Sequence, residues 1–266
     1  MRIACNRFPG GRHKALTLSY DDGSIHDRRL VEIFNSGGVR GTFHLNSGMF
    51  GPPGKVGAEE VAALYAGHEV SVHTVNHPTL ATLPPDLIAA EIRDDRRNLE
   101  SLVGYPVRGM SYPNGSFDDR ILRMLPSLGI EYARTVIPSN VFDLPADFLA
   151  WTPTCHHKDD LMERAEKFVE PSRWNPLELF YVWGHSYEFD RLKNWDLMEK
   201  FCKKVGGRSD LVWYATNIEI VDYINAVRRL RFSVACDLVY NPSGQSVWIT
   251  VDDKPREIAA GQTVRL

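Results

Sequence analysis

The feature that most limits how this chain can fold is a regular alternation of short β-type runs with longer amphipathic stretches, from Lys14 to about Asn225. Such alternation is typical of an α/β fold with a largely parallel sheet. It amounts to seven or eight β/α units, a number that favours a closed or nearly closed (β/α) barrel over an open sheet. The expected strands are residues 15–20, 41–45, 69–72, 107–110, 130–135, 148–152, 179–183 and 211–214.

The stretches between these runs carry helix signals. The clearest lies at residues 85–102, where apolar residues recur close to one face: Ile88, Ile92, Leu99, Leu102 and Val103. We expect a second helix at residues 28–36, which Gly37 and Gly38 can terminate in a left-handed cap, and a third at residues 58–66, stopped by Gly67. Further helices are expected near Arg120, Met162, Met198 and Ile220.

The composition changes after about Arg231, where β-branched residues become frequent and turn signals appear at residues 241–244 and 252–254. We therefore expect a barrel domain at residues 1–230, followed by a small β appendage at residues 231–266. About three dozen residues cannot bury enough apolar surface to fold alone. The appendage should pack on the barrel.

Bulk properties exclude several classes of function. The net charge of -3 and the absence of a basic stripe argue against a nucleic-acid partner. No stretch has the unbroken apolar character of a signal peptide or the length of a membrane span, so we expect a cytoplasmic protein without a membrane partner. The four cysteines are scattered without a Cys-x-x-Cys pair, which favours reduced, unpaired thiols.

Three polar signals follow expected strands: the Asp-Asp-Gly run with Asp21 and Asp22, the pair His73 and His77, and His185. In a (β/α) barrel the carboxyl ends of the strands share one face, where these side chains would converge. Each signal has a plainer interpretation. Asp-Asp-Gly is a common turn, two histidines four apart are often incidental, and a histidine after a strand can be held in the core by backbone hydrogen bonds.

Together, however, two imidazoles and one carboxylate make a three-ligand site that leaves positions open for water and substrate, which is the composition of a catalytic zinc centre. Asp22, His73 and His77 are the expected ligands. Thr74 stands where a zincin has the glutamate that acts as base, so the base must come from elsewhere. The neighbouring carboxylate of Asp21 is free for that task.

The ordered segments SYDDG, HTVNH, SYPNG and FYVWGHS resemble the motifs of the polysaccharide deacetylase (NodB-like, carbohydrate esterase family 4) family, over roughly residues 15–223. The resemblance implies a distorted (β/α) barrel and a metal-dependent hydrolase that acts on carbon–nitrogen bonds other than peptide bonds, removing an N-acetyl or related acyl group from a carbohydrate. It makes Asp21 the catalytic base, Asp22, His73 and His77 the metal ligands, and His185 the acid that protonates the leaving amine.

The same resemblance suggests residues that bind a small-molecule or oligosaccharide substrate. The backbone N–H of Asn114 is expected to contact the oxyanion, next to Tyr112 in the same motif. Trp183 and Tyr187 flank His185 and are candidate sugar-stacking walls or plain core residues. Trp151, in a loosely matched fourth motif, is the best candidate for a further pocket wall.

Four other residues near the fourth motif carry weaker signals. Asp143 and Asp147 are candidates to support the imidazole of His185, and equally candidates for loop caps. His156 and His157 are expected near the rim, either as substrate-binding residues or, as the simpler interpretation, in a solvated loop.

The third motif departs from the family pattern, because Ser111 stands where an arginine normally orients the base, and Arg108 lies three residues too early. Without a guanidinium, Asp21 should be more basic. The pocket should also gain room, which favours a small amide or a short N-acetylated oligosaccharide over a polymer. The competing possibility is that Arg108, or an arginine distant in sequence, restores the arrangement.

Three rival functions remain open from the sequence. The same site suits a small non-sugar linear amide or imide. A catalytically silent carbohydrate-binding barrel would need neither Asp21 nor His185. A purely structural metal protein would want a fourth protein ligand.

Overall fold

The computed structural model describes residues 1–51, 53–171 and 177–266. Its central feature is a parallel sheet of eight strands in the order β6-β5-β4-β3-β2-β8-β7, with β9 paired to the start of β2. The long strand β2 is buried along its whole length. The strands are β2 (Lys14–Asp21), β3 (Gly41–Leu45), β4 (Glu69–Val72), β5 (Gly109–Ser111), β6 (Tyr132–Arg134), β7 (Cys155–His156), β8 (Glu178–Gly184) and β9 (Val212–Tyr214).

The sheet curls until its two ends are linked through the segment that precedes and includes β7. Trp151 forms a parallel bridge with Arg134 of β6, and the N–H of Thr154 donates to the carbonyl of Tyr181 in β8. At the other edge of β2, β9 pairs with residues 14–16 and β3 with residues 18–21, so the barrel splits there. The predicted distorted (β/α) barrel is confirmed.

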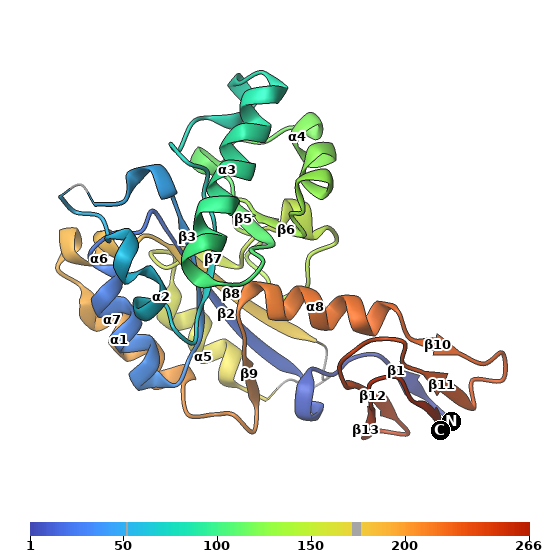
Figure 1. Cartoon of the computed structure of the whole chain (residues 1–266). Helices are drawn as coiled ribbons and strands as arrows, with labels where there is room; N and C mark the ends of the chain where they lie inside the picture. The colour runs from blue at the N-terminus through green and yellow to red at the C-terminus, as the bar shows by residue number, and fades with distance from the viewer. Residues whose placement is uncertain (52, 172–176) are drawn as a thin grey trace.

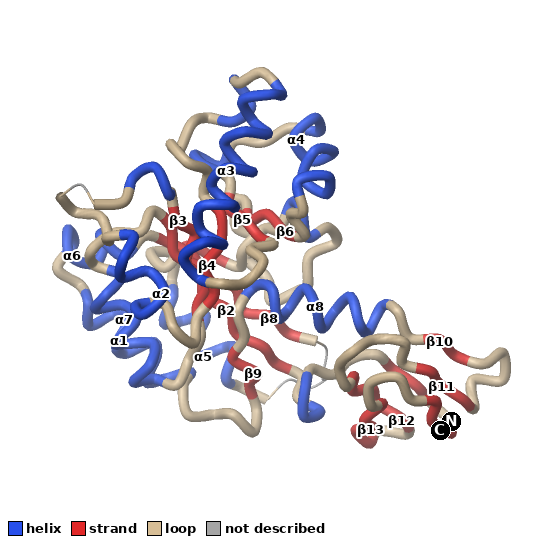
Figure 2. The backbone as a smooth tube through the Cα atoms, in the orientation of Figure 1, coloured by secondary structure: helices blue, strands red, loops and turns tan. Residues whose placement is uncertain are grey.

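Helices cover the outside of the sheet, as Figure 2 shows. They are α1 (Asp27–Gly37), α2 (Val61–Leu64), α3 (Pro85–Val103), α4 (Asp119–Met124), α5 (Leu161–Val169), α6 (Ser186–Leu192), α7 (Trp195–Val205) and α8 (Asn217–Arg228). As predicted, α1 ends in a left-handed cap at Gly38, with φ of 64°. The face of α3 that buries Ile88, Ile92 and Leu99 also buries a charged residue, Asp95.

Two predicted elements differ from the structure. The strand expected at residues 148–152 is wrong: Phe148–Ala150 form a short 3₁₀ turn, which Asp147 caps by accepting the Leu149 N–H at 2.8 Å. The strand begins only at Cys155, after Pro153, which has no N–H to give to a ladder. The helix expected at residues 58–66 is shorter, because Ala58–Glu60 form a 3₁₀ turn before the four residues of α2.

The C-terminal region forms two small antiparallel sheets beside the end of α8, where both chain termini also lie (Figure 1). One sheet contains β1 (Ile3–Ala4), β12 (Val247–Val251) and β13 (Lys254–Ile258); the other contains β10 (Arg231–Phe232), β11 (Leu238–Tyr240) and β14 (Thr263–Arg265). The buried side chains of these sheets, Val239, Val247, Ile249 and Ile258, form one cluster with Ala226 of α8 and with Leu230. The division of the chain after residue 230 stays a prediction, and β1 adds a strand from the N-terminal segment.

Two further expectations concern the chain as a whole. All four cysteines carry free thiols, as predicted; Cys155 and Cys202 are buried, and Cys5 and Cys236 are exposed. Among the described residues, no helix combines the length and apolar character required to cross a membrane.

Candidate active site

The residues predicted to carry chemistry meet in one cavity of about 280 Å³ at the carboxyl ends of the barrel strands. Asp21 is the last residue of β2, and His185 directly follows β8. His73 directly follows β4. The cavity is lined by Asp21, Asp22, His73, His77, Tyr112, Asn114, Val136, Trp183, His185 and Tyr187.

Asp22, His73 and His77 present a compact set of donor atoms. Asp22 Oδ1 lies 3.7 Å from the Nε2 atom of each histidine, and the three donors lie within 4.8 Å of one another. Ligands about 2.0–2.1 Å from a tetrahedral zinc ion are separated from each other by roughly 3.3–3.5 Å. The donor set therefore fits a divalent cation with a small inward movement.

The imidazole of His73 is held so that Nε2 faces the other donors. Its Nδ1 lies 3.0 Å from the Ser111 carbonyl oxygen and 2.7 Å from Ser111 Oγ. A proton on Nδ1 leaves the lone pair of Nε2 available, the arrangement expected of a metal-binding histidine. Burial lowers the pKa of His73 to about 4, although Asp21 and Asp22 oppose the shift. The ring is thus neutral at neutral pH, as a ligand must be.

Asp95 fixes the loop that carries His73. Its carboxylate, buried on α3, accepts the backbone N–H of His73 at 3.1 Å and that of Ser47 at 2.7 Å. Asn46 adds hydrogen bonds from Nδ2 to the carbonyls of His73 and Thr74. The loops after β3 and β4 are therefore tied together directly beneath the donor set.

Several non-glycine residues at the site have left-handed backbone conformations. The φ angles are 80° at Asp22, 67° at Thr74, 56° at His77 and 56° at Asn114. Thr74 Oγ1 accepts the N–H of His77 at 3.1 Å and stabilises the tight turn between the histidines. Such conformations cost about 1–3 kcal/mol each and concentrate at functional sites.

Asp21 is oriented by Ser111 of β5 and Arg134 of β6, two strands that pair with each other. Ser111 Oγ donates to Asp21 Oδ1 at 3.2 Å, and the fully buried guanidinium of Arg134 forms an ion pair with Oδ2. Ser111 and Arg134 are register partners, so the short Ser111 side chain leaves the space through which Arg134 reaches Asp21. Arg134 also lies over the ring of Trp183, 4.2 Å from its centroid.

This pairing corrects two predictions. Burial alone would raise the pKa of Asp21, but the charge of Arg134, aided by His73, holds that pKa well below its usual range. The prediction of a more basic Asp21 is therefore wrong, and the room expected at Ser111 is filled by Arg134. The competing idea of an arginine distant in sequence is the one that the structure supports, while Arg108 pairs with Asp222 at 2.6 Å.

The carboxylate that faces His185 comes from α6 and not from the predicted Asp143 or Asp147. Glu188 Oε2 lies 3.5 Å from His185 Nδ1, whereas Asp147 caps a turn. Burial lowers the pKa of His185, but the Glu188 and Asp21 carboxylates outweigh it and raise that pKa above its usual value. This shift stabilises the imidazolium form of His185 relative to that of a histidine in water.

The placement of His157 in a solvated loop is also wrong. The His157 ring is 1% exposed, stacked on Phe189 at a centroid distance of 4.2 Å and on Tyr20 at 5.8 Å. Aromatic residues of β2 and α6 therefore draw it into the core. His156 belongs to β7 and is only partly buried.

The predicted aromatic walls separate into two groups. Trp183 and Tyr187 line the cavity on either side of His185. Tyr112 contributes an edge, but its ring is buried and its hydroxyl donates to the Leu149 carbonyl at 2.6 Å. Trp151 lies instead in a buried aromatic cluster with Tyr132, Phe148 and Tyr181, because the segment that carries it closes the barrel.

Three residues of the site, Arg134, Asp95 and Glu188, were not predicted from the sequence, although the sequence contains a signal for each of them. Arg134 is a charged residue inside an expected buried strand. Asp95 stands at helical spacing with Ile92 and Leu99 on the apolar face of α3. Glu188 follows His185 by three residues, the spacing that brings two side chains together in a first helical turn.

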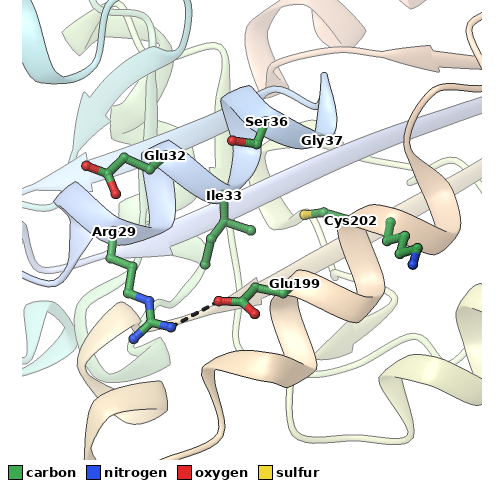
Figure 3. Close-up of a pocket in the computed structure, with 8 residues that line it drawn as sticks. Arg29, Glu32, Ile33, Ser36, Gly37, Glu199 and Cys202 are labelled. Atoms are coloured by element: carbon green, nitrogen blue, oxygen red, sulfur yellow. Dashed lines mark hydrogen bonds and ion pairs between the residues drawn. The ribbon is translucent and has the colours of Figure 1, made fainter.

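A larger cavity of about 490 Å³ lies on the outside of the barrel (Figure 3). Its lining comes from α1 and α7, and an ion pair of 3.0 Å between Arg29 and Glu199 spans it. The chemically active side chains converge on the smaller cavity, so the larger one is not our candidate site.

Comparison with known proteins relates the first half of the chain to a known family. The sequence profile of the polysaccharide deacetylase family matches residues 9–133. The chain is similar to chitin deacetylase 1 of Cryptococcus neoformans, with 29% identity over 115 residues, which is 42% of this chain and 24% of that protein. The match thus spans about a quarter of that curated relative.

Two solved structures share the fold. The Xyl-CE4 domain of a multidomain xylanase from the hindgut metagenome of Trinervitermes trinervoides is 14% identical, with a TM-score of 0.54, over 80% of this chain and 92% of that chain. A family 4 acetyl xylan esterase from Clostridium thermocellum, in complex with a cobalt ion, is 16% identical, with a TM-score of 0.52, over 78% of this chain and 90% of that chain. The profile match over residues 9–133, the ordered motifs and the barrel thus make this chain similar to polysaccharide deacetylases.

Proposed function

We propose that this protein removes an N-acetyl or related acyl group from an N-acylated carbohydrate by attack of water on the amide carbonyl. The observation that carries the proposal is the meeting, in one cavity, of a three-donor cation site, an arginine-paired carboxylate and a histidine whose pKa is raised. A binding barrel without catalytic activity requires only the donor set. The base and the acid indicate bond cleavage.

Asp22, His73 and His77 would hold a divalent cation, for which zinc suits the mixed nitrogen and oxygen donors. Bound there, the cation would supply Lewis acidity toward the amide carbonyl and lower the pKa of water.

Asp21 takes the proton from the attacking water. Its Oδ2 lies 3.8 Å from His73 Nε2, so the carboxylate faces the space next to the donor set. Arg134 and Ser111 fix both of its oxygens and keep it ionised at neutral pH. A positioned and ionised carboxylate meets the geometric and protonation requirements for a general base.

His185 donates a proton to the nitrogen that departs. Its Nδ1 faces Glu188, which leaves Nε2 as the atom that gives up the proton. Water and the amide thus give a carboxylic acid, such as acetic acid, and a free amine, and the proton that Asp21 takes from water balances the proton that His185 gives to nitrogen. The backbone N–H of Asn114, in the turn after β5, is the proposed donor to the oxyanion.

The cavity of about 280 Å³ falls just below the ~300–1,000 Å³ of pockets that enclose drug-sized ligands. It therefore suits the reacting unit of a sugar, with Trp183 and Tyr187 as walls. A small non-sugar amide is the second candidate, because the same small cavity favours compact substrates.

A screen for released amine tests the proposal directly. Purified protein with one equivalent of zinc is given monomeric, oligomeric and polymeric N-acetylglucosamine substrates together with small linear amides. We expect the highest kcat/KM on a short N-acetylated oligosaccharide. Turnover confined to non-sugar amides would replace the carbohydrate by the second candidate, and a steady rise of kcat/KM with chain length would contradict the small-substrate expectation.

A further inference from the structure

A second set of metal-ligand side chains lies beside the catalytic cavity, at the end of β7 and the start of α6. Glu188 Oε2 lies 3.1 Å from His156 Nε2 and 3.2 Å from His157 Nε2. One donor atom from each of these three residues lies within 4.8 Å of the others. Two imidazole nitrogens and one carboxylate oxygen are the donors that zinc-like ions select.

Among these three residues, His157 is the one whose buried ring nitrogens require a binding partner. Its ring is buried, and although Nε2 lies 3.2 Å from Glu188 Oε2, neither ring nitrogen makes a hydrogen bond of good geometry with any of the described residues. Buried polar atoms of this kind are rare in folded proteins and point to an ion, a water molecule or a special role.

The surroundings of His157 fix the direction from which a partner must come. A Cβ atom added to Gly184 would lie 2.0 Å from His157 Nδ1, so that nitrogen is closed off by the backbone of β8. Phe189 and Tyr20 stack on the ring and hold its plane. The ring therefore presents Nε2 to Glu188 and His156.

We propose that His156, His157 and Glu188 form a second divalent-cation site, distinct from the site of Asp22, His73 and His77. Distances of 3.1 and 3.2 Å between donor atoms approach the roughly 3.3–3.5 Å expected around a tetrahedral zinc ion. Lys158 pairs with Oε1 of Glu188, so Oε2, which also faces His185 Nδ1 at 3.5 Å, is the oxygen that would reach the cation. The ammonium of Lys158 also repels a cation, so the second site is the weaker of the two.

Zinc binding to the full-length chain tests this proposal without any assay of activity. Protein freed of metal by a chelator is titrated with zinc in equilibrium dialysis, and bound zinc is counted by elemental analysis. Cobalt titration gives a second reading, since tetrahedral cobalt absorbs visible light. Wild type is expected to bind two equivalents, the second at least about tenfold more weakly.

Four variants assign each equivalent. The triple variant Asp22→Asn, His73→Ala, His77→Ala should retain only the weaker equivalent. His157→Phe, which keeps the stacked ring, and His156→Gln should each lose the weaker equivalent and keep the tighter one. Lys158→Gln should tighten the weaker equivalent by roughly tenfold or more, because the competing cation is gone.

The results that overturn the proposal are equally definite. Wild type that saturates at one equivalent, together with a triple variant that binds none, would show that protons and Lys158 alone satisfy the cluster. A second equivalent that survives in both His157→Phe and His156→Gln would lie elsewhere on the surface. Circular dichroism checks folding, and His156→Gln decides alone if His157→Phe does not fold.

Discussion

The two clusters of histidine and carboxylate at the top of the barrel have similar donors and different surroundings. Next to Asp22, His73 and His77, the guanidinium of Arg134 pairs with Asp21, so the carboxylate of Asp22, the proposed ligand, takes no part in that ion pair. Around His156 and His157, the carboxylate of Glu188, which is the proposed ligand there, is itself paired with Lys158. The first set also opens onto the cavity, whereas His157 is enclosed by aromatic rings.

We infer from this difference that charge placement separates the proposed catalytic cluster from one that would only bind a cation. In the proposed mechanism Asp21, kept ionised by the buried guanidinium of Arg134, accepts the proton, while Asp22, His73 and His77 hold the cation. The second cluster contains a single carboxylate, that of Glu188, which would have to act both as ligand and as proton acceptor. We therefore assign water activation to the first cluster alone.

The largest effect should distinguish the two adjacent carboxylates of the first cluster. Asp21→Asn should retain metal and lower kcat by about 100- to 10,000-fold, because the proton acceptor is lost. Asp22→Asn should weaken metal binding, with activity partly recovered by excess zinc. Metal content and initial rates, measured on the same preparations, check both outcomes. Wild-type turnover by Asp21→Asn would assign the base to another group.

A smaller effect should follow from breaking the ion pair between Arg134 and Asp21. Among the described residues, the second cluster has no such pair outside its proposed ligands. Arg134 lowers the pKa of Asp21, so Arg134→Met should raise it and move the acidic limb of kcat/KM to higher pH. We also expect kcat to fall by about 10- to 100-fold through poorer positioning of the base. Arg134→Lys is the matched control, since it keeps the charge without the planar fork. An acidic limb that stays in place in the Met variant would separate Arg134 from the base.

The smallest effect concerns the contact between Glu188 and the proposed acid. Glu188 raises the pKa of His185 against the effect of burial, and the imidazolium exists below that pKa. Glu188→Gln should therefore move the alkaline limb of kcat/KM to lower pH, with kcat reduced by about tenfold, the lower end for residues that orient a functional imidazole. The profile is recorded at one equivalent of zinc. A limb that moves upward would reverse the assigned role of Glu188.

The sequence predicts the architecture well because alternation and strand-end motifs are local signals. Residues predicted from those motifs, among them Asp21, His73 and His185, meet in one cavity, since parallel strands bring their carboxyl ends to one face. The predicted roles of these residues await the experiments above.

What the sequence does not reveal depends on which residues become neighbours across strands. Arg134 replaces the missing arginine from the adjacent strand, which requires knowledge of the register between β5 and β6. The burial of His157 depends on Tyr20 and Phe189, far from it in the chain. The misplaced strand at residues 148–152 arises because a capped turn and Pro153 override β-type residues.

The most direct test of the central claim is a zinc titration of metal-free protein that follows deacetylation at each step. Acetate release from an N-acetylated oligosaccharide is measured beside bound zinc in wild type, His73→Ala and His157→Phe. We predict that wild-type activity is absent without metal and rises in proportion to the first, tighter equivalent. His157→Phe should bind that equivalent as wild type does, while His73→Ala should bind it poorly and remain inactive. Full activity in the metal-free protein, or activity that follows only the second equivalent, would contradict the assignment of catalysis to Asp21, Asp22, His73 and His77.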